Sequence, residues 1–149
     1  WESVTSSNIH PRRKTRESAM QALFAYQFSK DDSNLVLGRL FEMFPERKKN
    51  SDFLKHLFHS VLLNAKWADD IIRSHLQNWE FDRVAQLDRV LLRMGICEIY
   101  FMEDIPPKVS ISEMVEIAKI YSTEESSGFI NGILDAVYKE YLEKEKKLI

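Results

Sequence analysis

Residues 87–101 read LDRVLLRMGICEIYF and form the most apolar helical pattern of the chain. Apolar side chains recur there at steps of three and four, which is the spacing of one face of an α-helix. The residues on this face are Leu87, Val90, Leu91, Met94, Cys97, Tyr100 and Phe101. We therefore expect this helix at the centre of the protein, with Asp82 capping its start.

The same spacing predicts helices on both sides of this segment. Before it, we expect helices over Arg13–Ser29 and Leu35–Phe44, and two more between Asp52 and Leu76 that meet near Asn64. After it, we expect one helix that begins with a Ser110–Glu113 capping box and a last helix that carries Phe129 to Tyr138. Only four glycines and four prolines occur in 149 residues, and no alternating strand pattern is evident. The sequence thus predicts an all-α protein with about seven helices in one compact domain.

The composition of the chain limits the kinds of ligand, the disulfide content and the cellular location that we expect. The net charge is −2, so affinity for nucleic acid must come from a local patch. The single cysteine, Cys97, excludes an internal disulfide and fits a small buried side chain. No apolar run approaches the roughly 18 residues that span a bilayer, so we expect a cytoplasmic protein. Residues 1–11 are expected to be a disordered segment, residues 12–142 the folded domain, and residues 143–149 a charged, solvated tail.

Cations crowd the start of the first predicted helix, at Arg12, Arg13, Lys14 and Arg16. Helix N-termini carry partial positive charge and favour acidic residues, so this cluster costs stability unless an anion binds there. The helix that follows presents Gln21 and Gln27 as polar neighbours, which suit nucleic-acid recognition. A solvated basic start to a surface helix is the alternative interpretation.

A polar run, residues 122–127, leads into the last helix and precedes Gly128, Phe129 and Gly132. Free backbone N–H groups and hydroxyls at a helix start can bind phosphate or sugar. The favoured interpretation is a capped helix start, with both glycines permitting close helix packing. Phe129 is either a core residue or a surface for stacking a base.

Asp88 and Arg89 interrupt the apolar stretch of the central helix. The simplest explanation is that both charges face solvent. The more specific explanation is that they form an exposed strip to which a partner protein binds.

Elsewhere no Gly-rich phosphate loop or nucleophile elbow is present, and His56 and His59 lack a supporting metal motif. Paired acids such as Asp69 and Asp70 fit predicted turns or helix starts. We therefore expect neither an enzyme nor a cofactor or metal site.

Five segments of the chain form a further pattern: residues 17–24 (ESAMQALF) after the basic start, 87–93 (LDRVLLR), 105–113 (IPPKVSISE), 115–119 (VEIAK) and 127–135 (SGFINGILD). Together these segments resemble the NusB family of bacterial transcription factors. The resemblance extends from Arg12 to about Tyr138. It implies an all-α fold of two small helical subdomains and a non-catalytic role in antitermination of ribosomal RNA transcription.

Members of this family pair with NusE, a ribosomal protein of the small subunit, and the pair binds boxA single-stranded RNA in the transcription elongation complex. The resemblance therefore implies that Arg12, Arg13, Lys14 and Arg16 contact phosphates. It places Gln21, Phe24, Glu125, Ser126 and Phe129 nearer the bases, and Asp88, with Arg89 beside it, on or near the surface for NusE. Formation of a homodimer is left open.

Two departures from the family pattern affect this site. Phe24 stands where relatives often have Tyr, and Ser122 and Thr123 stand where relatives carry Gly-rich residues. Two alternatives also remain. One is a helical adaptor that binds only proteins; the other is the similar RNA-binding domain of ribosomal RNA cytosine methyltransferases, which a catalytic domain would follow.

Overall fold

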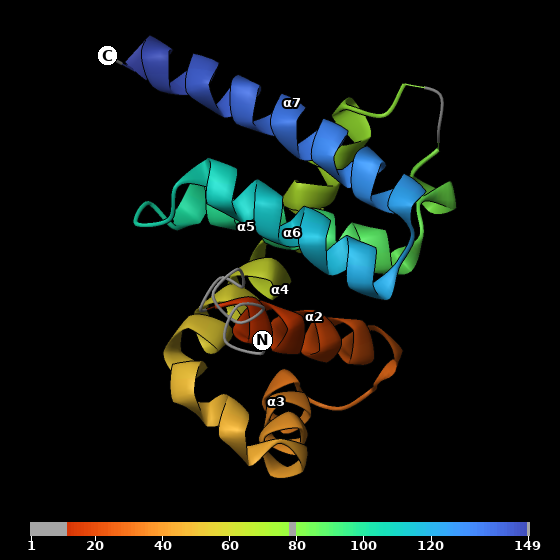
Figure 1. Cartoon of the computed structure of the whole chain (residues 1–149), viewed down its shortest axis with the longest axis vertical. Helices are drawn as coiled ribbons and strands as arrows, with labels where there is room; N and C mark the ends of the chain where they lie inside the picture. The colour runs from red at the N-terminus through yellow and green to blue at the C-terminus, as the bar shows by residue number, and fades with distance from the viewer. Residues whose placement is uncertain (1–11, 78–79, 149) are drawn as a thin grey trace, which may run out of the picture. The chain divides into compact units, whose positions relative to one another are not determined.

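A computed structural model of the chain describes residues 12–77 and 80–148, and these residues contain α-helices, 3₁₀-helices and no strand (Figure 1). The predicted disordered segment 1–11 therefore lies outside the described residues. The elements are α2 (Arg13–Phe28), α3 (Ser33–Met43), η1 (Pro45–Asn50), α4 (Ser51–Ser74), η2 (Phe81–Arg83), α5 (Gln86–Phe101), α6 (Pro107–Tyr121) and α7 (Glu124–Leu148). The all-α prediction is confirmed.

The chain divides into two compact units, in agreement with the two subdomains that the resemblance implies. The N-terminal unit ends at Phe58 and contains α2, α3, η1 and the first turns of α4. Its buried apolar side chains include Met20, Leu23, Leu37, Leu40 and Leu54. The amphipathic spacing of α2, α3 and the start of α4 places these residues on inward faces.

The C-terminal unit begins at His59 and is built around α5, α6 and α7, which pack against one another in pairs (Figure 1). Ten of the sixteen residues of α5 are buried. Leu91, Leu92, Met94 and Ile96 are fully enclosed, which confirms the prediction that residues 87–101 form a central helix.

Helix α4 carries the predicted interruption. Asn64 has non-helical backbone angles (φ −112°, ψ 15°), and its side-chain amide donates a hydrogen bond of 2.8 Å to the carbonyl of Ser60. A side chain that competes for the carbonyl four residues earlier disturbs the helical hydrogen-bond ladder and bends the helix. The predicted meeting of two helical segments near Asn64 is therefore confirmed.

Two local predictions of helix caps are wrong. Asp82 does not cap α5, because it lies in η2 and Ala85 occupies the N-cap position. Ser110 forms no capping box, because α6 already begins at Pro107 and the Ser110 hydroxyl donates to Glu98 Oε1 at 2.7 Å in the core. Residues 143–147 of the predicted solvated tail are exposed, and they continue α7.

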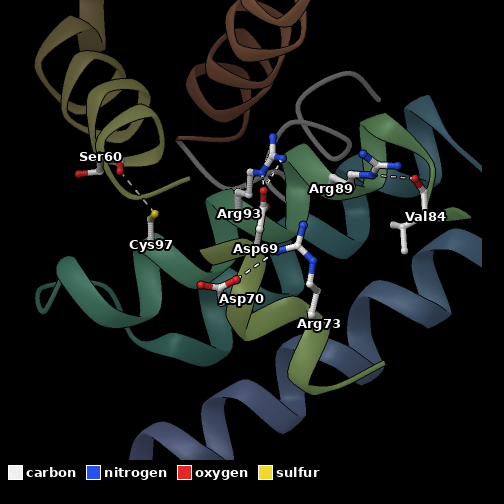
Figure 2. A network of polar contacts seen from close by, with 8 residues as sticks. All are labelled: Ser60, Asp69, Asp70, Arg73, Val84, Arg89, Arg93 and Cys97. Atoms are coloured by element: carbon white, nitrogen blue, oxygen red, sulfur yellow. Dashed lines mark hydrogen bonds and ion pairs between the residues drawn. The ribbon is translucent and has the colours of Figure 1, made fainter. Parts of the chain in front are cut away.

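Cys97 is a buried thiol, as predicted, and lies on the interior side of α5. Its Sγ approaches the Ser60 carbonyl oxygen at 3.8 Å (Figure 2). Burial, with a smaller contribution from the Glu98 carboxylate, raises the pKa of the Cys97 thiol from 9.0 to about 12. The thiol is therefore protonated at neutral pH and is not an activated nucleophile.

Close helix packing depends on a glycine other than the two that the sequence suggested. A Cβ atom at Gly95 of α5 would lie 2.7 Å from Leu134 Cδ1 of α7. At Gly128 and Gly132 a Cβ atom would have no neighbour within 4 Å, so the expected packing role of these two glycines is wrong.

This difference predicts stability changes of opposite sign. Gly95→Ala should lower the free energy of unfolding by about 1 kcal/mol, because the clash with the fully buried Leu134 outweighs the gain in helix propensity. Gly128→Ala and Gly132→Ala should each raise it by about 0.5–1 kcal/mol, because only the propensity changes. Urea unfolding followed by circular dichroism measures all three. A stabilised Gly95→Ala variant would contradict the packing described here.

Candidate nucleic-acid interface

The start of α2 presents cations without an acidic residue in its first turn. Arg12 and Arg13 are partly exposed, and Lys14 is exposed. The guanidinium of Arg12 lies 4.3 Å from the centre of the Phe53 ring, so a cation–π contact orients this side chain. Three of the four predicted phosphate contacts are thus accessible from solvent within the N-terminal unit.

Arg16 differs from the other three cations because it is 0% exposed. Its guanidinium lies 5.2 Å from the centre of the Phe53 ring, the same ring that the guanidinium of Arg12 contacts. A direct contact with phosphate requires a solvent-facing guanidinium, which this structure does not provide. The predicted role of Arg16 is corrected to a buried one that supports the start of α2.

Gln21 and Phe24 follow on the next turns of α2. The Gln21 side-chain oxygen accepts a hydrogen bond from the guanidinium of Arg47 in η1. Phe24 is half-buried and meets Phe28 edge to face, with ring centres 5.2 Å apart. Phe28 is 65% exposed, so the pair presents aromatic surface to solvent. Sequence reasoning missed Arg47 and Phe28, although Phe28 lies at helical spacing from both Phe24 and Gln21.

In the C-terminal unit, the polar run before α7 caps that helix. The backbone N–H of Ser126 donates to the Thr123 hydroxyl oxygen at 2.9 Å, and the Ser127 hydroxyl donates to the Glu124 carbonyl at 2.7 Å. Glu124 and Glu125 lie in the first turn, where negative charge complements the helix dipole. The capped-start interpretation of this run is confirmed.

A groove of about 370 Å³ opens beside this cap, between α5 and α7. The lining residues are Arg83, Val84, Ala85, Asp88, Thr123, Glu125, Ser126 and Phe129. We call it the α5–α7 groove. It brings Asp88 of α5 together with Glu125, Ser126 and Phe129 of α7, and the sequence singled out all four of these residues.

Asp88 and Arg89 are not the exposed charged strip that the sequence suggested. Asp88 is only 5% exposed, and its carboxylate accepts a hydrogen bond of 3.3 Å from the Ser122 hydroxyl. Arg89 donates to the carbonyl oxygen of Val84 at 2.9 Å (Figure 2). It also donates to the carbonyl oxygen of Asp82 at 2.9 Å. Asp88 therefore lines the groove itself, whereas Arg89 holds the backbone of Val84, which also lines it.

The paired acids have structural partners. Asp69 lies within α4, not at a turn, and accepts two hydrogen bonds from Arg93 of α5 at 2.6 and 2.9 Å (Figure 2). Asp70 pairs with Arg73 at 3.1 Å on the exposed side.

Within residues 12–77 and 80–148, no three His, Cys, Asp or Glu side chains gather to hold a metal ion. Nor is any helix in this part of the chain long and apolar enough to cross a membrane.

Comparison with known proteins identifies one family. The family model that matches residues 13–139 describes the NusB family. A relative from Chloroherpeton thalassium, the transcription antitermination protein NusB, is 45% identical over 137 residues, which are 91% of this chain and 65% of the relative. The chain therefore spans about two thirds of that relative's length.

Solved structures agree with this result. NusB of T. maritima matches with a TM-score of 0.78 and 35% identity, covering 94% of this chain and 99% of the other. A chain in a crystal structure of the antitermination factors NusB and NusE in complex with dsRNA matches with a TM-score of 0.76 and 27% identity. That match covers 87% of this chain and 97% of the other.

Proposed function

Because the chain belongs to the NusB family, we propose that it is a transcription antitermination factor that binds RNA and catalyses no reaction. It binds boxA-type single-stranded RNA together with NusE, acts within the transcription elongation complex and supports transcription of ribosomal RNA. The observation that carries this proposal is the likeness, over 87% of the chain, to a protein solved with NusE and RNA.

The exposed start of α2 supplies the electrostatic part of RNA binding. Arg12, Arg13 and Lys14 contact backbone phosphates and release bound counterions, which makes the affinity fall as salt rises. Because the net charge is −2, these cations act as a local patch and the affinity of the chain alone is modest. A partner that contributes its own RNA contacts raises the apparent affinity by joining two weak sites.

Aromatic and polar groups supply the preference for particular bases. Unpaired RNA bases stack on exposed aromatic rings, which the pair Phe24 and Phe28 offers in the N-terminal unit. In the C-terminal unit, Phe129 and the Glu125 carboxylate share the α5–α7 groove. A carboxylate repels phosphate and accepts hydrogen bonds from amino groups, so this groove receives a base or a 2′-hydroxyl rather than the backbone.

The surface for NusE includes the wall of the α5–α7 groove that Asp88 and Arg89 shape. Asp88 acts there by fixing the position of its neighbours, since little of its side chain reaches solvent. Arg89 contributes the half-exposed edge of a guanidinium that stacks over Phe81 at 4.6 Å. Removing either side chain changes the shape of this wall as well as its charge.

Isothermal titration of the chain into purified NusE tests the partner directly. We expect a saturable one-to-one complex, because a family member has been solved together with NusE. Size-exclusion chromatography with light scattering gives the mass of the complex and reveals any homodimer of the chain alone. The absence of heat together with separate elution of the two proteins would refute the proposed pairing with NusE.

A further inference from the structure

Three consecutive cations lie outside the basic start of α2. Arg47, Lys48 and Lys49 belong to the 3₁₀-helix η1 (Pro45–Asn50). Lys48 and Lys49 are exposed, whereas Arg47 is half-buried. The turn therefore gives its three cations different orientations, and only some of them face α2.

Arg47 is held in place from two sides. Its guanidinium lies 3.9 Å from the centre of the Phe44 ring and donates a hydrogen bond to the side-chain oxygen of Gln21 in α2. A guanidinium has five N–H donors, so the bond to Gln21 leaves others for a ligand. Because its orientation is already fixed, little side-chain entropy is lost when an anion binds.

A groove of about 330 Å³ lies between α2 and η1, within the N-terminal unit. The residues that line it are Lys14, Thr15 and Ser18 of α2 and Glu46, Arg47, Lys49 and Asn50 of η1. Three cations thus face one carboxylate, so the lining has an excess of positive charge. We call it the α2–η1 groove.

We propose that the α2–η1 groove binds a phosphate of the RNA backbone, an inference that rests on the proposed function. Lys14, Arg47 and Lys49 supply charged donors from both sides of the groove, which is the chemistry that phosphodiesters require. Lys14 also belongs to the basic start of α2, so a strand bound at Arg12 and Arg13 continues into this groove. Glu46 reduces the positive charge and weakens binding without reversing it.

Two neighbouring lysines provide a matched test. Lys49 lines the groove, whereas Lys48 is exposed in the same turn and is not among the lining residues. Lys49→Gln and Lys48→Gln change the net charge equally. We expect Lys49→Gln to weaken binding of labelled single-stranded RNA about two- to fivefold and to reduce the slope of log K against log salt by about 0.7. Lys48→Gln should leave the slope of the wild type unchanged.

The outcomes separate the two proposals. Equal slopes for Lys49→Gln and Lys48→Gln, with wild-type binding intact, would overturn the groove as an RNA contact and leave the proposed function standing. Loss of inorganic phosphate binding in Lys49→Gln with unchanged RNA affinity would assign the groove to a free anion instead, and would also overturn it. A wild-type chain that binds no RNA, with or without NusE, would refute the proposed function itself.

Discussion

Arg16→Ala is expected to lower the free energy of unfolding by about 2–5 kcal/mol, the range for removing a large buried side chain. Arg16 is 0% exposed and packs over the Phe53 ring. A buried guanidinium is retained only where its donors are satisfied, so truncation leaves both a cavity and unsatisfied polar partners. Urea unfolding by circular dichroism gives the magnitude.

Lys14→Ala is the matched control, because Lys14 is an exposed cation half a turn away on the same helix. Its effect should remain within about 0.5 kcal/mol. If Arg16→Ala unfolds at the same urea concentration as Lys14→Ala, the side chain of Arg16 is not buried in solution. Its role as a phosphate contact would then be restored.

The double variant Arg12→Glu with Arg13→Glu should lose about 30- to 100-fold in RNA affinity. Each lost charge-assisted contact is worth about 1 kcal/mol, and the new carboxylates repel the backbone. The salt slope should fall by about 1.4, because each contact with a single strand contributes about 0.7. Fluorescence anisotropy of labelled RNA at several salt concentrations measures both quantities.

Reversing Lys146 and Lys147 near the end of α7 gives a control with the same change in net charge. This control should bind RNA within about threefold of the wild type, since unspecific charge alone acts weakly at physiological salt. Equal losses in the two double variants would mean that net charge, and not the start of α2, governs binding.

The same Arg12 and Arg13 variant should melt close to the wild type. Two carboxylates at a helix N-terminus gain about 0.3–1 kcal/mol each from the helix dipole. Losing the cation–π contact between Arg12 and Phe53 costs about 0.5–1 kcal/mol in return. A large fall in affinity with an unchanged melt therefore identifies a binding surface and excludes unfolding as the cause.

Helix positions were predictable because they follow from local spacing. The pattern of residues 87–101 predicted the central helix α5 and the burial of Val90, Leu91, Met94 and Cys97, although Phe101 at its end is 42% exposed. The change of pattern near Asn64 predicted the bend in α4. The caps were predicted less well. Ser110 matches a capping box in sequence, yet its hydroxyl bonds to Glu98, a residue on another helix that local reasoning cannot supply.

In the candidate site, too, features set by local sequence were predictable, and features set by tertiary contacts were not. Cations at the start of α2 were evident from sequence, but the burial of Arg16 depends on packing that no local pattern encodes. Asp88 could have been placed more accurately, because it precedes the buried Leu91 and Leu92 by three and four residues and shares their helix face. Arg47 could not be found, since its bond to Gln21 joins residues that are distant in sequence.

The proposed binding of boxA RNA together with NusE is measured by the fluorescence anisotropy of labelled boxA-type single-stranded RNA, titrated with the chain with and without NusE. A scrambled single strand and a duplex of the same length serve as competitors, and two salt concentrations measure the electrostatic contribution. We predict selective binding to the boxA-type strand that strengthens with NusE and weakens with salt. Equal affinity for the boxA-type and scrambled strands, unchanged by NusE, would contradict the account.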